Sequence, residues 1–143
     1  MMNGNYTRTL GLDIGDRWIG IALSDPGNIL ASPLSIIERT TEERDVAAIT
    51  DIIRQHQVAK VIVGLPVSMD GKIREQAEKV KTFVRILSTA TDLPVEFRDE
   101  RLSTKSARRL MQESGRKKSN RNKRDDANAA AVILQGYLDE QRL

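Results

Sequence analysis

The first apolar pattern in the chain predicts a β-hairpin over residues 9–25. Apolar residues are closely spaced over 10–14, as in a strand, and alternate with small residues over 19–23. Gly15 and Asp16, between the two runs, are turn-forming residues. Asp13 stands inside the first strand, where the chain is expected to be buried. A lone ionised carboxylate is expensive to bury, so Asp13 needs a metal, a cation or several donors, unless it is a hydrogen-bonded structural residue near the strand end.

The rest of the chain is predicted to alternate between strands and helices. A third strand is expected over 29–37, where Pro33 suits an edge or bulge position. The apolar periodicities that follow predict helices over 42–56, 72–90, 104–114 and 126–141 and strands over 60–64 and 95–98. Strands joined through helices are connected by right-handed crossovers and therefore run parallel. We expect an α/β fold with a five-stranded mixed sheet, in which three antiparallel strands precede parallel crossovers, flanked by helices.

Composition favours a single domain over residues 1–143. Hydrophobic residues make up 39% of the chain and charged residues 30%, as in ordinary globular domains. The absence of cysteine excludes disulfides, cysteine metal sites and cysteine nucleophiles. No apolar run approaches the ~20 residues of a membrane span, and the first residues lack the apolar block of a signal peptide. We expect a cytoplasmic protein with no membrane partner, whose residues 1–7 are frayed.

Positive charge gathers in one segment, although the formal net charge is only +3. Residues 115–124 begin with glycine and contain no apolar side chain, so they cannot bury themselves and are expected to form a mobile loop. Their charge indicates a polyanion partner, with a solvated loop kept basic for solubility as the alternative. The basic residues are Arg116, Lys117, Lys118, Arg121, Lys123 and Arg124.

Two further acidic pairs fall where sites gather in α/β sheets. Asp99 and Glu100 follow the last predicted strand, and Asp125 and Asp126 open the last predicted helix. Asp126 shares the apolar face of that helix and is expected to point to the sheet, whereas Asp125 suits a helix cap. Alternation along the strand sends Asp99 and Glu100 to opposite faces, and the residues alone do not decide which of them joins Asp13.

Carboxylates brought to one place repel one another unless cations join them. Oxygen ligands suit Mg²⁺ or Mn²⁺ rather than Zn²⁺. Two such ions ~3.5–4 Å apart can activate water and stabilise the leaving oxygen of a phosphodiester. Together with a basic segment that attracts a phosphate backbone, the acidic cluster indicates a metal-dependent nuclease.

Four stretches resemble the YqgF family in order and spacing: LGLDIGDRWIGIALSD, VIVGLPVSMDG, EFRDERLST and DDANAAAVILQGYL. The family consists of small bacterial proteins of ribonuclease H-like fold, described as pre-16S ribosomal RNA nucleases or Holliday junction resolvases, and the match covers about residues 9–138. The resemblance implies a catalytic and metal-binding triad of Asp13, Glu100 and Asp126, with Mg²⁺ or Mn²⁺ as the cofactor. It also implies that nucleic acid is held by Arg101 and the six basic residues named above.

The resemblance favours processing of the 5′ end of precursor 16S ribosomal RNA by a monomer or a weak homodimer. One alternative is resolution of four-way DNA junctions, which requires a two-fold dimer. Another is a non-cleaving nucleic-acid-binding factor in ribosome maturation or transcription. The hairpin also resembles that of sugar kinases and actin-like ATPases, but 143 residues leave no room for the second domain that those proteins close on a nucleotide. Trp18 stands where the family commonly has a basic residue, and is expected to pack against the sheet rather than to stack on a base.

Overall fold

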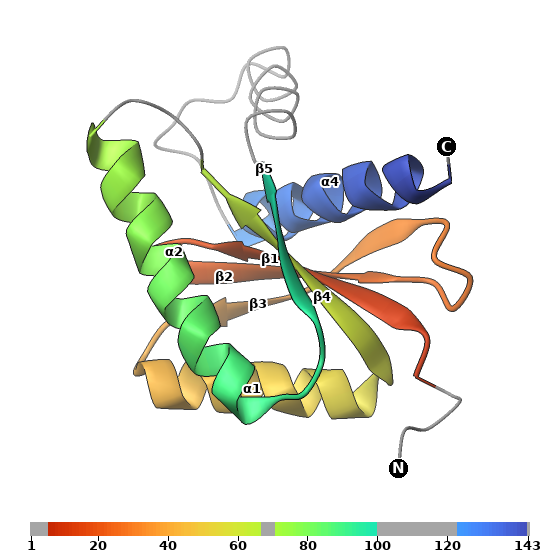
Figure 1. Ribbon diagram of the computed structural model, residues 1–143, viewed down its shortest axis with the longest axis horizontal. Coiled ribbons are helices and arrows are strands. Elements are labelled where there is room, and N and C mark those ends of the chain that lie inside the picture. Colours follow the sequence, from red (N-terminus) through yellow and green to blue (C-terminus); the bar gives the residue numbers. More distant parts are fainter. Residues whose placement is uncertain (1–5, 67–70, 100–122, 143) are drawn as a thin grey trace.

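Five strands form one mixed sheet at the centre of the molecule (Figure 1). The computed structural model describes residues 6–66, 71–99 and 123–142, apart from the side chains of 71–73 and 123–126. The strands are β1 (Arg8–Ile14), β2 (Trp18–Ser24), β3 (Ala31–Glu38), β4 (Val58–Leu65) and β5 (Val95–Asp99). Their order across the sheet is β3-β2-β1-β4-β5. β2 is antiparallel to both β1 and β3, whereas β4 is parallel to both β1 and β5.

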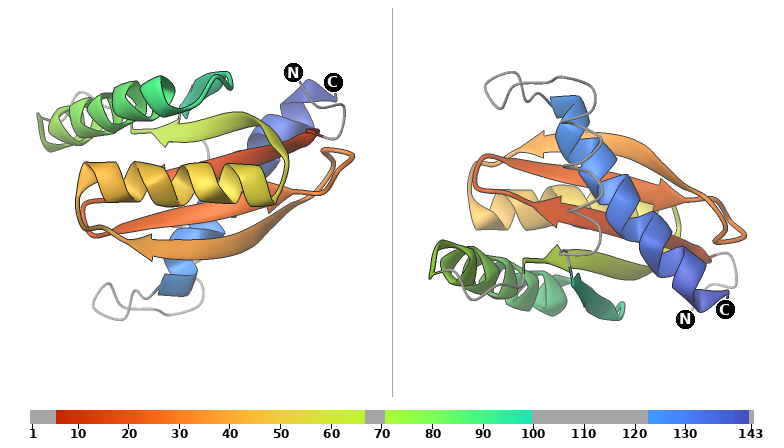
Figure 2. Two further views of the ribbon diagram at one scale, coloured as in Figure 1. Left: turned by 90° about the horizontal axis from the view of Figure 1, so that it is seen from below. Right: turned by 90° about the horizontal axis from the view of Figure 1, so that it is seen from above.

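Helices cover both faces of the sheet (Figure 2). α1 (Glu42–Gln55) and α2 (Gly71–Ala90) lie on one face, and α4 (Lys123–Gln141) crosses the other. The result is a three-layer α/β arrangement in which the central strand β1 is covered on both sides. The chain thus follows the predicted fold class.

Alternation along β1 divides its side chains between the two layers. Leu10, Leu12 and Ile14 belong to the larger core beneath α1 and α2, together with side chains such as Phe83. Gly11 lies on the opposite face, where α4 packs. Because successive residues of a strand point to opposite sides, Asp13 shares the α4 face with Gly11.

Glycine at position 11 lets α4 lie directly on the backbone of β1. A Cβ atom at this position would come within 2.8 Å of the Leu134 Cβ atom and 3.1 Å of the Ala130 carbonyl oxygen. Ala130 and Leu134 are fully buried in the smaller core, which also contains Ala22 and Ile62 of the sheet. The missing side chain therefore fixes how closely α4 approaches the sheet at this point.

The strands and the first two helices are confirmed with small shifts of their ends. β3 is an edge strand, and its pairing register shifts where Pro33 faces Ala22, so this proline occupies both of the positions predicted for it. Thr41 caps α1 by accepting a hydrogen bond of 3.1 Å from the Arg44 backbone N–H. The Thr7 backbone N–H donates to the Gln57 carbonyl at 3.2 Å. The fraying expected for residues 1–7 therefore does not extend to Thr7.

The start of the last helix requires a correction. α4 begins at Lys123, three residues before the predicted start, so Lys123 and Arg124 belong to the helix and not to a loop. Asp125 consequently lies within the first turn and is not the N-cap residue. Lysine and arginine are good helix formers and extend the helix although they add nothing to its apolar stripe.

Several predictions concern segments that the structure does not describe. The helix expected over 104–114 lies outside the described residues, as do residues 1–5 and 115–122. The single domain over 1–143 and the mobile basic loop therefore stay predictions. Within the described part of the chain, no helix has the length and apolar character needed to cross a membrane.

We predict that Gly11→Ala destabilises the protein by about 1–3 kcal/mol, the usual range for an overpacked core. The added methyl group collides with the Leu134 Cβ atom and the Ala130 carbonyl, so α4 must move away from β1. Urea unfolding followed by circular dichroism measures the change. Gly27→Ala is the matched control, because the nearest atoms there belong to the side chains of Asp25 and Ile29, and a change below about 0.5 kcal/mol is expected. Equal effects of the two substitutions would contradict the packing argument.

The turn between β2 and β3 is held by the Asp25 carboxylate. It accepts backbone hydrogen bonds from Ile29 at 2.7 Å, from Leu30 at 2.8 Å and from Gly27 at 3.2 Å. The bonds from Leu30 and Ile29 favour the ionised form and lower the pKa of Asp25 below its ordinary value of 3.8.

We predict that Asp25 contributes stability that is present above the unfolded-state pKa of about 4 and disappears as the pH falls through the lower folded-state pKa. A carboxylate with a depressed folded pKa binds its proton more readily in the unfolded chain, so acid favours unfolding. Carboxyl NMR titration of Asp25 checks the direction of the pKa shift. Urea unfolding between pH 3 and 6 should show a weaker pH dependence for Asp25→Asn than for wild type. A folded pKa at or above 3.8 would refute this account.

Candidate active site

Asp13 lies near the carboxyl end of the central strand, on the face that α4 covers. It is half-buried, and its antiparallel partner in β2 is Gly20. On the other side, the register that pairs Leu12 with Val63 brings Gly64 of β4 beside it. Both neighbouring residues are glycines, so neither adjacent strand places a side chain directly beside Asp13. Asp13 does have an interaction partner of its own.

The packing of α4 brings its amino-terminal end towards Asp13. Gly11 meets Ala130 and Leu134, while Tyr137, further along the helix, contacts Lys60 near the start of β4. α4 therefore runs from the carboxyl ends of β1 and β4 towards their amino ends. Asp126 precedes Ala130 by four residues, about 6 Å along a helix, and Asp13 lies about 6.6 Å beyond Gly11 along the strand. The backbone of Asp126 and that of Asp13 therefore lie on the same side of the Gly11 contact, towards the carboxyl end of β1.

The direction in which each β5 side chain points indicates which of Asp99 and Glu100 can lie on the same face as Asp13. Val95 packs on the core beneath α1 and α2. Glu96 forms an ion pair with Lys60, and Arg98 forms one with Glu140 of α4, so both of these side chains lie on the α4 face. Alternation then directs Asp99, the last residue of β5, to the face opposite Asp13.

Arg98 is a residue of this face that the sequence reasoning missed. It pairs with Gly64, the glycine beside Asp13, and its side chain is only 13% exposed. Its guanidinium lies over Gly136, where a Cβ atom would come within 2.6 Å of an Arg98 nitrogen. Within the described part of the chain, the Arg98 Nε atom is buried without a hydrogen-bond partner. Two sequence features could have indicated this contact: Gly136 in the middle of the last helix, and Arg98 two residues after Glu96 in the last strand.

The structure does not describe the side chains of the other predicted site residues. Glu100, Arg101, Arg116, Lys117, Lys118 and Arg121 lie outside the described residues, and of Lys123, Arg124 and Asp126 only the helical backbone is described. Among the side chains that are described, no group of three or more acids, histidines or cysteines is arranged to hold a metal. The predicted triad is therefore represented by Asp13 and by the backbone of Asp126.

Trp18 lies on the same face of the sheet, two residues before Gly20 in β2. It is half-buried, and the Arg17 guanidinium carbon lies 5.3 Å from the centre of its ring. An aromatic side chain beneath a cation is a stable surface element. The prediction that Trp18 packs against the sheet agrees with its partial burial.

The turn that follows Asp13 is held from the opposite face. The Arg39 Nη1 atom donates to the Gly15 carbonyl at 3.1 Å, and Gln76 of α2 donates to the Ile14 carbonyl at 3.3 Å. Arg39 is fixed in turn by the buried Asp45 carboxylate, at 3.3 Å, and its guanidinium carbon lies 5.1 Å from the Phe83 ring centre. One side chain from the connection between β3 and α1 and one from α2 thus restrain the backbone next to Asp13.

The sequence matches one protein family over most of its length. Residues 7–140 match the family model described as RuvX: Holliday junction resolvase. A protein of Dehalococcoides mccartyi named as a pre-16S rRNA nuclease is 54% identical, covering 89% of this chain and 94% of its own. A protein of Roseiflexus with the same name is 43% identical, covering 99% of this chain and 100% of its own.

Two of the solved structures with a similar fold are Holliday junction resolvases. Thermus thermophilus RuvC in complex with a Holliday junction substrate superposes with a TM-score of 0.62 and 14% identity, over 95% of this chain and 96% of that one. The fowlpox virus Holliday junction resolvase has a TM-score of 0.56 and 16% identity, over 93% and 99% of the two chains. At such low identity these likenesses establish the ribonuclease H-like fold alone.

We predict that Arg39→Met destabilises the protein by about 3–5 kcal/mol, because it leaves the Asp45 carboxylate buried without its cation. The Asp45 side chain is only 2% exposed. Arg54→Met is the matched control, since Arg54 and its partner Asp51 are both exposed, and it should change the free energy of unfolding by less than about 0.5 kcal/mol. Adding Asp45→Asn to Arg39→Met should recover part of the loss in urea unfolding. If the double variant is no more stable than Arg39→Met, the ion pair is not the cause.

Proposed function

Because the chain belongs to the RuvX family and is a nuclease, we propose that it hydrolyses phosphodiesters at Asp13, Glu100 and Asp126. The observation that carries this proposal is the position of Asp13 near the carboxyl end of the central strand, between two glycines. The close contact at Gly11 supports it, because it turns the amino end of α4, and with it Asp126, to the same end of the sheet.

Glu100 completes the set in this proposal. Glu96 and Arg98 lie on the α4 face, and the residue two positions after Arg98 falls in phase with them if the chain continues as a strand. Asp99 is out of phase. The phase of β5 and the family resemblance therefore both favour Glu100 over Asp99 in this proposal.

The donor set fits hard divalent cations. Asp13, Glu100 and Asp126 offer only oxygen ligands, which suits Mg²⁺ or Mn²⁺, and we propose that these three residues hold the metal. Bound there, such ions supply Lewis acidity towards the scissile phosphate and lower the pKa of water. The chain's own contribution is to keep the three carboxylates together, with Arg39 and Gln76 fixing the backbone that follows Asp13.

Basic residues bring the phosphate backbone to this end of the sheet. We propose that nucleic acid is held by Arg101, Arg116, Lys117, Lys118, Arg121, Lys123 and Arg124. The last two begin α4, whose amino-terminal end is itself attractive to anions. Arg98, which lies beside Gly64 and pairs with Glu140, adds a further positive charge to this face of the sheet.

The substrate favoured by this proposal is precursor 16S ribosomal RNA, cut near its 5′ end in the cytoplasm. The support is the shared name of relatives that are 43–54% identical over most of the chain. The description of the family model favours four-way DNA junctions as the second candidate. Junction cleavage would require two active sites related by two-fold symmetry, whereas trimming an RNA end proceeds on a monomer.

We predict that Asp13→Asn lowers divalent-metal-dependent cleavage by at least about 100-fold, since loss of groups that merely support a metal ligand already has effects of 10- to 100-fold. Asp16→Asn is the matched control. Asp16 lies three residues away, and its pair with Lys79 at 3.4 Å is exposed, so cleavage should change less than twofold. Single-turnover assays with Mg²⁺ or Mn²⁺ measure both rates, and circular dichroism checks the fold. Undiminished cleavage by Asp13→Asn would overturn the assignment.

The same assay, run on precursor 16S RNA fragments and on four-way junction DNA, distinguishes the candidate substrates. We expect wild type to cut the RNA, and Glu100→Gln and Asp126→Asn to be as inactive as Asp13→Asn. Symmetric cutting of the junction by a dimer would favour the second candidate. Binding of either substrate without cleavage would favour a non-cleaving factor in ribosome maturation or transcription.

A further inference from the structure

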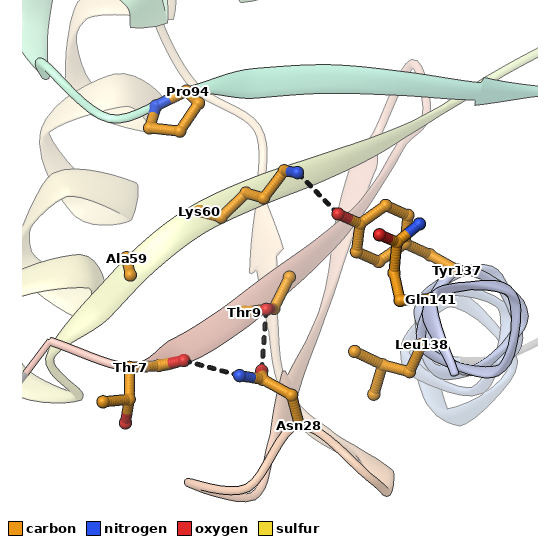
Figure 3. A pocket seen from close by; sticks show the side chains of 9 residues that line it. All are labelled: Thr7, Thr9, Asn28, Ala59, Lys60, Pro94, Tyr137, Leu138 and Gln141. Atoms are coloured by element: carbon orange, nitrogen blue, oxygen red, sulfur yellow. Dashed lines mark hydrogen bonds between the residues drawn. The ribbon is translucent and has the colours of Figure 1, made fainter. Parts of the chain in front are cut away.

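A pocket of about 380 Å³ lies at the opposite end of α4 from the candidate active site. It is open to solvent and is lined by residues from the starts of β1 and β4, the turn after β2 and the last turns of α4 (Figure 3). Lys60 and Tyr137 form one wall, and Thr9 and Asn28 form another. The volume falls in the range of small-molecule sites, which begins at about 300 Å³.

The walls of this pocket are fixed by hydrogen bonds between the residues that line it. The Thr9 hydroxyl donates to the Asn28 side-chain oxygen at 2.8 Å, and the Asn28 amide donates to the Thr7 carbonyl at 2.8 Å. Across the pocket, the Lys60 ammonium donates to the Tyr137 hydroxyl at 2.5 Å. Asn28 has a positive φ of 58°, and these bonds hold it there. A pocket with such walls needs little ordering when a ligand enters.

The pocket combines one cation with flat and apolar surfaces. Among the residues that the structure describes, Lys60 is the only charged one that lines the pocket. Burial lowers the pKa of Lys60, but hydrogen bonds to Glu96 and Tyr137 outweigh this effect, so the pKa lies above its ordinary value and the side chain stays protonated. The Tyr137 ring, Pro94 and Leu138 supply apolar surface, and the Gln141 amide supplies hydrogen-bonding groups.

We propose that this pocket binds a nucleotide, with the phosphate at Lys60 and the base against Tyr137 and Gln141. The orientation follows from charge, because the carboxyl end of α4 carries partial negative charge and repels a phosphate. A planar base fits an aromatic wall, since base–aromatic stacking tolerates any base. In this proposal the phosphate displaces the Glu96 carboxylate from Lys60, and the Glu96 side chain, which is 50% exposed, turns towards solvent.

The distance between the pocket and the candidate active site bears on whether the bound nucleotide belongs to the nucleic-acid substrate. Lys60 and Gly64 lie on the same strand and the same face, four residues or about 13 Å apart. That separation equals about four nucleotides of a stacked strand at ~3.4 Å each. The bound unit is therefore either a nucleotide of the nucleic-acid substrate, in which case the inference rests on the proposed function, or a free nucleotide.

The first experiment titrates ¹⁵N-labelled full-length protein with adenosine monophosphate, ribose 5-phosphate and inorganic phosphate. Adenosine monophosphate should shift the amide signals of Lys60, Tyr137 and Gln141, with an affinity at least about tenfold above that of ribose 5-phosphate because of stacking. Shifts confined to other parts of the chain would overturn the proposal. Equal affinities of the three probes would also overturn it, because they would mark a site for phosphate alone.

Variants with opposite expected effects separate binding from folding. Lys60→Met removes the charge but keeps the alkyl chain, and should weaken binding of adenosine monophosphate by at least about tenfold. Glu96→Gln removes the competing carboxylate and should strengthen binding by about two- to fivefold. Lys81→Met is the matched control, because Lys81 is exposed on α2 and pairs only with Glu78 among the described residues. Weakening by both Lys60→Met and Glu96→Gln would overturn the assigned role of Lys60.

A second arm distinguishes the two sources of the nucleotide without relying on cleavage. Binding of an RNA oligonucleotide to Asp13→Asn protein should shift the same amide signals if the pocket holds part of the substrate. If only the free nucleotide shifts them, the site takes a separate small ligand. An absence of shifts with both probes would overturn the inference, whether or not wild type cleaves RNA, whereas pocket binding without any cleavage would count against the proposed function alone.

Discussion

The close contact between α4 and the backbone of β1 at Gly11 determines what the rest of this sheet face can do. A helix that packs on a sheet normally has side chains filling the space between the two layers. Here the helix residues Ala130 and Leu134 meet a strand position that has no side chain. The helix axis is therefore fixed at one point of β1, and the two ends of the helix are directed to the two ends of the central strands.

The two ends of α4 differ in their electrostatics. The amino-terminal end, with its positive partial charge and the residues Lys123 and Arg124, lies towards the carboxyl ends of β1 and β4, where Asp13 stands. The carboxyl-terminal end lies over the starts of the same strands, beside Lys60. The amino-terminal end of α4 thus attracts anions by its own partial charge, whereas the positive charge beside its carboxyl-terminal end comes from Lys60 of β4.

Much of this arrangement could be predicted from the sequence, and the exceptions have physical reasons. The apolar pattern around Asp13 predicted its strand, because period-two patterning is a strong local signal, whereas Asp13 itself is only half-buried. The start of α4 was misplaced, because Lys123 and Arg124 favour helix by propensity and leave no mark in the apolar pattern. The contacts of Arg98 with Gly136 and Glu140 join residues about 40 positions apart, and such pairings depend on how the layers pack.

The choice between Asp99 and Glu100 depends both on alternation along β5 and on which face of β5 packs beneath α4. Sequence alternation requires that the two carboxylates point to opposite faces, but it cannot tell which face lies beneath α4. The ion pairs of Glu96 with Lys60 and of Arg98 with Glu140 supply that information, because each lies on the α4 face. With the phase of β5 fixed in this way, Asp99 is directed to the face of α1 and α2, away from Asp13. The geometry of this edge strand thus directs Asp99 away from the Asp13 face, and Glu100 stays the proposed partner of Asp13.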